Sequence, residues 1–281
     1  MREISVETIK NTIKDLFIDA NKSLCREEET AILTAAQNED SPLGKKVMKM
    51  IADNLFFAKN ADLPICQDTG MAVVFIDIGQ DVHITGGDLS KAINDGVAQA
   101  YTDGKLRSSV VKDPVFDRSN TKNNTPAIVH TNIISGDKIK ITAVPKGFGS
   151  ENMSAIKMFN PSSSREEIID FVCETVKNAG SNPCPPIFVG VGIGGTFDYA
   201  PYLAKKALAR GINVKNPDEN YKKLEDDILE KVNNIGIGPQ GFGGKTTALG
   251  VNVEFYPTHI AGLPVAVNIN CHVMRHKSAI I

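Results

Sequence analysis

A chain of 281 residues, 42% of them hydrophobic and 23% charged, has the balance of a globular protein that buries a substantial core. Its formal net charge of -2 argues against a nucleic-acid-binding protein, whose surface needs clustered lysine and arginine, and favours small molecules or protein partners. There is no apolar run of about 18 residues and no apolar signal core at the N-terminus, so we expect a cytoplasmic protein without a membrane partner.

The first sixty residues have a helical pattern. Behind an N-cap at Ser5, apolar residues recur at Ile9, Ile13 and Phe17, the spacing of an amphipathic helix. Residues 26–37 and 42–60 repeat this character. We therefore predict a helical N-terminal segment over residues 1–60.

After Pro64, β-branched runs alternate with helical patterns, which predicts a fold of the α/β (mixed α+β) class. A helix is expected to begin near Asp88. The remaining strands are expected at 71–78, 126–134, 137–144, 186–195, 247–257 and 264–271, and the remaining helices at 164–180, 199–211 and 216–236. No repeat or linker interrupts this order, so residues 61–281 are expected to form a sheet with flanking helices, within a single domain over 1–281.

Three glycine-rich stretches invite a nucleotide-binding interpretation. GPQGFGGKTT (residues 238–247) ends like a Walker A loop, but Pro239 stands where its first glycine belongs. GVGIGG (190–195) and GIGPQG (236–241) match the dinucleotide pattern G-x-G-x-x-G, yet neither is followed by the helix, second strand and acidic residue of that motif. We expect these glycines to allow tight turns and close backbone approach.

The five cysteines form no C-x-x-C pair. Cys25 and Cys173 lie in helical patterns and are expected to be structural, whereas Cys66, Cys184 and Cys271 lie in loops or at strand ends. Three thiolates can hold an iron–sulfur cluster and leave one iron open to a substrate.

Two other interpretations of these three cysteines stay open at this point. They could be unrelated loop residues, because their wide separation carries no local ligand signature. They could also form a closed structural zinc site with a histidine such as His259 or His272, in a non-catalytic metal-binding module.

Five stretches in one colinear order, from about residue 5 to 276, carry a family resemblance. They are LPICQDTG, KGFGSENMS, GSNPCPPIFVGVGIGGTFDYA, GPQGFGGKTTALGVNVE and HIAGLPVAVNINCHVMRH. Together they resemble the α subunit, or N-terminal half, of the class I (iron–sulfur) fumarate hydratases and the related L-tartrate dehydratases. The resemblance implies a [4Fe–4S] cluster held by Cys66, Cys184 and Cys271, and it assigns GGKTT to the family pattern instead of a nucleotide loop.

The activity implied by the resemblance is that of a lyase: reversible hydration of fumarate to L-malate, a step of the tricarboxylic acid cycle. The open iron would act as a Lewis acid on the substrate hydroxyl and one carboxylate, and its exposure implies sensitivity to oxygen. L-tartrate dehydratase is the alternative within the same chemistry, because its substrate differs by one hydroxyl.

The resemblance also implies roles for residues beside the cysteines. Gln67 and Asp68 would contact substrate, with Asp68 handling the hydroxyl proton, although an aspartate in QDTG also suits a turn. Arg107 would clamp a carboxylate, or it is a solvated charge. Gly149, in the KGFGSEN stretch, would offer a backbone N–H to a substrate oxygen.

Two residues farther along the chain complete the expected site. His259 corresponds to the active-site histidine of the family, with a buried structural histidine as the alternative. Lys245 would bind an anion of the substrate or orient the nearby backbone.

A partner chain is also implied. Longer, single-chain members of the family continue into a second domain that supplies further carboxylate-binding residues and the proton-abstracting residue, whereas this sequence ends at Ile281. We therefore expect a separate β subunit in an α2β2 assembly, and little activity from the α chain alone.

Overall fold

A computed structural model describes residues 2–281 as two compact units that interleave along the sequence. The first unit comprises residues 2–25, 57–148 and 275–281, and the second comprises residues 26–56 and 149–274. The predicted mixed α/β class is confirmed. The chain passes from one unit to the other four times, and two of these passages lie inside helices α3 (Pro42–Ala61) and α5 (Phe148–Glu151). The sequence therefore has no linker-like segment that would mark the division. The single domain over residues 1–281 stays a prediction.

The first unit contains a four-stranded sheet in the order β10-β5-β2-β4 and a separate pair of parallel strands, β1 and β3. In chain order its elements are β1 (Arg2–Ser5), α1 (Val6–Lys22), β2 (Met71–Gly79), β3 (Val82–Thr85), α4 (Leu89–Asp103), β4 (Ile128–Ile134), β5 (Ile139–Lys146) and β10 (Lys277–Ile280). Strand β2 pairs parallel with β4 and antiparallel with β5.

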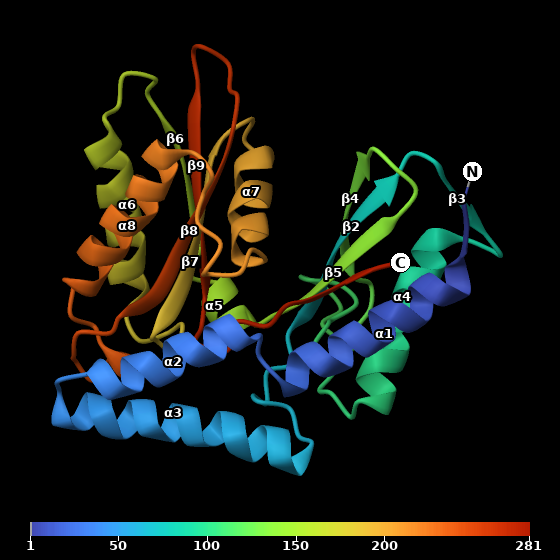
Figure 1. The fold of residues 1–281 in the computed structure, drawn as a ribbon, viewed down its shortest axis with the longest axis horizontal. Helices are drawn as coiled ribbons and strands as arrows, with labels where there is room; N and C mark the ends of the chain where they lie inside the picture. Colours follow the sequence, from blue (N-terminus) through green and yellow to red (C-terminus); the bar gives the residue numbers. More distant parts are fainter. Residues whose placement is uncertain (1) are drawn as a thin grey trace. The chain divides into compact units, whose positions relative to one another are not determined.

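Helices α1 and α4 pack together in this first unit, and α1 also contacts β5 (Figure 1). The periodic residues of α1 predicted to face a core, Ile9, Ile13 and Phe17, are fully buried. Ser5 caps α1 by accepting the N–H of Thr8, as the sequence predicts. A stripe of apolar side chains at helical spacing therefore joins the helices to the sheet.

The second unit is built on a four-stranded sheet in the order β6-β9-β7-β8. In chain order its elements are α2 (Arg26–Asn38), the larger part of α3 (Pro42–Ala61), most of α5 (Phe148–Glu151), β6 (Ala155–Phe159), α6 (Arg165–Ala179), β7 (Ile187–Gly194), α7 (Tyr199–Leu208), α8 (Glu219–Asn233), the short helix η1 (Pro239–Gly241), β8 (Ala248–Tyr256) and β9 (Leu263–Asn270). Strand β7 runs parallel to β8 and antiparallel to β9.

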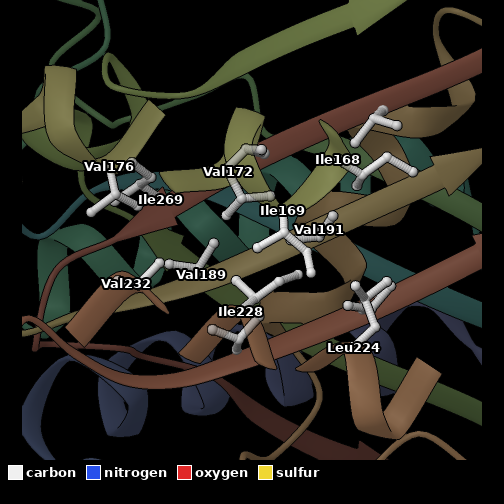
Figure 2. Packing of buried hydrophobic residues seen from close by; sticks show 14 of the residues in the cluster. Ile168, Ile169, Val172, Val176, Val189, Val191, Leu224, Ile228, Val232 and Ile269 are labelled. Atoms are coloured by element: carbon white, nitrogen blue, oxygen red, sulfur yellow. The ribbon is translucent and has the colours of Figure 1, made fainter. Parts of the chain in front are cut away.

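Helices α6 and α8 cover one face of this sheet and form the main core of the second unit. Figure 2 shows the interdigitated side chains, which come from α6 (Ile168, Ile169, Val172, Val176), α8 (Leu224, Ile228, Val232), β7 (Val189, Val191) and β9 (Ile269). All of these side chains are buried. This packing fixes β7 and β9, the two strands that lead to candidate site residues.

Helix α7 packs on β7 so closely that only glycine fits beneath it. A Cβ added at Gly190 would collide with the carbonyl oxygen of Ala204, and one at Gly192 would collide with that of Ala200. GVGIGG is thus strand β7 packed under a helix, in agreement with the expected close backbone approach and without the geometry of a dinucleotide-binding turn.

Four short strands were not expected from the sequence: β1, β3, β6 and β10. Each has four or five residues, which is too short for an alternation of apolar and polar residues to be recognised. Strands β6 and β10 lie at the edges of their sheets, where each pairs with one neighbouring strand. Within residues 2–281, no helix combines the length and the apolar character needed to cross a bilayer.

Candidate active site

The loop before β2 presents Cys66 and Gln67 and is anchored at several backbone groups. Cys66 is half-buried and Gln67 is exposed. The hydroxyl of Tyr101 lies 2.7 Å from the carbonyl oxygen of Thr69 and 2.8 Å from that of Gly70. Burial raises the pKa of Tyr101 far above its ordinary value, so its hydroxyl remains a donor at any physiological pH. The neutral hydroxyl of Tyr101 therefore holds the carbonyl groups of Thr69 and Gly70 in the Cys66 loop.

Asp68 uses both carboxylate oxygens within the first unit. Its Oδ1 accepts the N–H of Gly70 at 3.0 Å, which is the local turn bond that an aspartate in QDTG favours. Its Oδ2 accepts the N–H of Phe148 at 3.0 Å. Each oxygen retains a second lone pair and the side chain is half-buried, so the turn role and a contact with substrate are compatible.

Arg275 is a buried arginine that supports the same loop. Its guanidinium donates to the carbonyl oxygen of Asp68 at 2.7 Å and to Oδ1 of Asn21 at 2.9 Å. Its side chain is 3% exposed. Both bonds are donated by Nη1, which lies one bond farther from the backbone than the nitrogen of a lysine side chain.

Arg107 lies next to this loop with its side chain exposed. Its carbonyl oxygen accepts the hydroxyl of Thr69 at 2.8 Å, which ties the backbone of Arg107 to the Cys66 loop. Among residues 2–281, no carboxylate forms an ion pair with its guanidinium, so the side chain remains available for an anion. The first unit thus brings together Cys66, Gln67, Asp68 and Arg107.

Cys184 and Cys271 meet at one end of the sheet in the second unit. Cys184 precedes β7 and Cys271 follows β9, and these strands are antiparallel with Phe188 opposite Asn270. Both residues therefore lie at the same end of these two strands, and this end is called the cysteine edge of the sheet. Nδ1 of His272 lies 2.9 Å from the carbonyl oxygen of Cys184, which links the two cysteine-bearing segments directly.

None of the five cysteines forms a disulfide in the described chain, residues 2–281. Cys184 is exposed and Cys271 is half-buried, so a metal could reach both. Cys173 differs, because burial in α6 raises the pKa of its thiol. Cys173 lies in a helix, as expected, whereas Cys25 lies between α1 and α2, because α1 ends at Lys22.

Gly149 lies near the Cys184 segment in the second unit. A Cβ added there would have the carbonyl oxygen of Asn182, two residues before Cys184, as its nearest neighbour at 3.7 Å. The residue is exposed. The backbone around Gly149 therefore borders the edge of the sheet that carries Cys184 and Cys271.

The GGKTT loop binds a carboxylate from its own chain. Oε1 of Glu39 accepts the N–H groups of Asp40, Ser41 and Lys245, and Oε2 accepts that of Thr246, all at 3.0 to 3.1 Å. Nζ of Lys245 pairs with Asp40 at 2.9 Å. The Walker-like loop therefore has an internal anion in place of a phosphate.

His259 lies at the opposite end of the second sheet from Cys184 and Cys271. It follows β8, whose last residue, Tyr256, is opposite Gly194 at the end of β7. The eight residues of β7 separate this end from Cys184 by at least about 23 Å, at roughly 3.3 Å per residue. The loop is not buried, and Nδ1 of His259 accepts the N–H of Ala261.

Three residues that hold these loops by hydrogen bonds were not predicted from the sequence: Tyr101, Arg275 and Glu39. Arg275 does fall inside the NINCHVMRH stretch, four residues after Cys271, so that motif contained a signal. Tyr101 and Glu39 are distant in sequence from the loops they hold. Their roles depend on contacts that no local pattern encodes.

Comparison with known proteins identifies the family of the chain. The family model described as fumarate hydratase (Fumerase) matches residues 10–280. A Methanocaldococcus jannaschii protein, provisionally named as an L(+)-tartrate dehydratase subunit alpha, is 41% identical over 271 residues, covering 95% of each chain. The L(+)-tartrate dehydratase subunit alpha of Escherichia coli O157:H7 is 31% identical over 247 residues, covering 86% of this chain and 80% of the relative. The chain therefore belongs to the fumarate hydratase (Fumerase) family.

Proposed function

We propose that this chain is the α subunit of an iron–sulfur hydro-lyase that catalyses the reversible hydration of fumarate to L-malate. The observation that carries the proposal is the meeting of Cys184 and Cys271 at one sheet edge, bordered by Gly149. The family match supports the chemistry. Dehydration of L-tartrate is the second candidate, favoured by the names of the two relatives described above.

The donor set fits a [4Fe–4S] cluster. Cys66, Cys184 and Cys271 are three thiols outside any disulfide, on loops whose backbones are anchored by other residues. When bound, such a cluster would supply an open iron that acts as a Lewis acid toward the substrate hydroxyl and one carboxylate.

We assign the chain's own residues the tasks of binding and proton transfer. The exposed guanidinium of Arg107 would pair with a substrate carboxylate, and the backbone N–H near Gly149 would donate to a substrate oxygen. Gln67 would contact the substrate beside Cys66. Asp68 would accept or return the hydroxyl proton, since the N–H groups of Gly70 and Phe148 hold its carboxylate in one orientation. Lys245 stays a candidate for substrate binding, with Asp40 as its present partner.

A zinc-binding module is the contrasting alternative. A closed zinc site would need a histidine beside the cysteines, and His259 is at the far end of the sheet from two of them. His272 would have only Nε2 to offer, because its Nδ1 bonds the carbonyl oxygen of Cys184. Both considerations favour the cluster.

The activity is proposed to require a β subunit, in an α2β2 assembly with the proton-abstracting residue on the β chain. The names of the α-subunit relatives support such a partner. His259 follows the end of the sheet that lies at least about 23 Å from Cys184 of the same chain, so in this proposal a second α chain delivers it to the substrate.

The first test is the iron and sulfide content of the anaerobically reconstituted chain. We expect about four of each per chain, and loss of both in Cys66→Ala, Cys184→Ala and Cys271→Ala. Cys173→Ala is the matched control and should keep its iron. One zinc per colourless chain, or no metal, would refute the proposal. Fumarate and L-tartrate are then assayed with the co-purified β chain, and the preferred substrate has the higher kcat/KM.

The second test addresses His259. His259→Asn and Cys184→Ala chains are each expected to be inactive with the β chain. Mixing and reassembling them should restore roughly a quarter of wild-type activity, because half of the α pairs are then mixed and each mixed pair contains one intact site. No recovery from verified mixed assemblies would contradict a histidine supplied by the second chain.

A further inference from the structure

The segment around Cys184 has few hydrogen-bond donors of its own. Residues 183, 185 and 186 are prolines, which lack an N–H group. The N–H of Cys184 donates to the carbonyl oxygen of Ser181 at 3.0 Å. Beyond that bond, this stretch of backbone can be held by hydrogen bonds only through its carbonyl oxygens.

Two residues from other parts of the second unit bind these carbonyl oxygens. The backbone N–H of Gln240 donates to the carbonyl oxygen of Pro185 at 2.6 Å, and its side-chain Nε2 donates to the same oxygen at 2.8 Å. Nδ1 of His272 lies 2.9 Å from the carbonyl oxygen of Cys184. The carbonyl oxygens of two successive residues are thus held.

The tautomer of His272 follows from this geometry. A carbonyl oxygen can only accept, so Nδ1 carries the proton that it donates to Cys184. The 3.4 Å separation between Nε2 of Gln240 and Nδ1 of His272 is then a contact between two donors instead of a hydrogen bond. The amide group of Gln240 is therefore directed to Pro185, and each residue holds its own carbonyl oxygen.

Backbone strain indicates that these contacts are needed. Cys184 has φ 54° and Gln240 has φ 52°, both in the left-handed region. This conformation is unfavourable for residues other than glycine, which keep it where surrounding contacts fix it. The hydrogen bonds to Pro185 thus join one of these residues, Gln240, to the chain neighbour of the other, Cys184.

We propose that Gln240 is a positioning residue that sets the direction in which Cys184 presents its thiol beside Cys271. Gln240 holds Pro185 by two hydrogen bonds, while His272 ties the Cys184 segment to the residue that follows Cys271. The thiols are pre-arranged in this way before any metal binds. The proposal rests on the proposed function only in taking these thiols as cluster ligands.

The test uses two substitutions and one control in the full-length chain. Gln240→Glu keeps the shape but directs an oxygen at the carbonyl of Pro185, where Nε2 donates in the wild type. Gln240→Gly keeps the left-handed backbone and its N–H but loses the side chain. Gln80→Glu makes the same chemical change at an exposed position and is the matched control.

The first readout is hydrogen exchange of the metal-free chain over residues 181–190. Gln240→Glu should exchange roughly fivefold to tenfold faster there than the wild type, while Gln80→Glu should not. Unchanged exchange in Gln240→Glu would overturn the proposal. This outcome does not depend on iron, so it is decided even if the wild-type chain takes up no cluster and the proposed function fails.

The second readout is made on chains reconstituted with iron and sulfide. We expect an altered electron paramagnetic resonance spectrum in Gln240→Glu, and iron loss to a chelator roughly fivefold faster than in the wild type. Gln240→Gly should lie between them, because it loses the side-chain bond without placing a carboxylate oxygen against the carbonyl oxygen of Pro185. Faster exchange combined with wild-type spectra and iron loss would reduce Gln240 to a structural role and overturn the proposal.

Discussion

Glu39 offers the most direct test of the link between the GGKTT loop and the fold. It is a fully buried carboxylate that accepts four backbone N–H groups, two of them from Lys245 and Thr246 in that loop. Burial alone would raise the pKa of Glu39, but the bonds from Ser41, Thr246 and Lys245 outweigh it and lower the pKa below the ordinary 4.5. The chain therefore holds a charged anion where a phosphate loop would hold its ligand.

Glu39→Gln removes the charge and one acceptor with little change of shape. In the better orientation, glutamine keeps three of the four bonds as neutral bonds, each weaker by about 1 kcal/mol, and leaves the N–H of Thr246 without an acceptor, at roughly 1–3 kcal/mol. These costs do not add fully, because the groups are neighbours. We expect a loss of about 3 kcal/mol in the free energy of unfolding at pH 7.

The stability difference between wild type and Glu39→Gln should depend on pH in a definite direction. A carboxyl group with a lowered folded pKa stabilises the fold above its unfolded pKa, and this contribution is lost as the pH falls through the folded pKa. The difference between wild type and Glu39→Gln should thus be complete at pH 7 and should shrink as the pH falls below about 4.5.

The assay is urea unfolding at a series of pH values, followed by circular dichroism, with hydrogen exchange of β8 to identify the transition of the second unit. Glu230→Gln, an exposed substitution on α8 with the same charge change, should cost less than about 0.5 kcal/mol. A Glu39→Gln cost that stays constant from pH 7 to well below 4.5, or one no larger than that of Glu230→Gln, would refute the role of the carboxylate.

Three further predictions concern Gly244, which borders Glu39, and Tyr101 and Arg275, which hold the loop before β2. Gly244→Ala should lower the free energy of unfolding by about 2 kcal/mol, because Gly244 has φ +130° and a Cβ would lie 2.7 Å from Oε1 of Glu39; an unchanged urea midpoint would contradict this. Tyr101→Phe should cost about 1–2 kcal/mol at pH 7, and above pH 10 it should make the fall in stability shallower than in the wild type by about 1.4 kcal/mol per pH unit, since the raised pKa keeps the folded tyrosine protonated; thermal unfolding in alkaline buffers measures both. Arg275→Lys should cost about 2–4 kcal/mol and speed hydrogen exchange over residues 66–70, because the lysine ammonium lies one bond nearer the backbone than Nη1 of arginine and cannot reach both acceptors; equal exchange would argue against a role of Arg275 in holding the carbonyl oxygen of Asp68.

Much of the secondary structure could be predicted because it depends on local periodicity. The apolar positions of α1 and the caps at Ser5 and Asp88 are found as expected, the latter with Asp88 accepting the N–H of Lys91. The failure of GPQGFGGKTT to match Walker A also pointed away from a nucleotide, and the loop is filled by Glu39. The two interleaved units were not predictable, because helices α3 and α5 run continuously across their boundaries.

The sequence by itself determined the amphipathic elements, the family and the identity of the candidate ligands, because each of these depends on residue type and order along the chain. Only the tertiary structure decided which of those residues meet. The antiparallel pairing of β7 with β9 brings Cys184 and Cys271 to one edge, while the parallel pairing of β7 with β8 carries His259 to the other. Strand direction and register are set by packing between residues distant in sequence, so no local pattern could have separated the histidine from the cysteines.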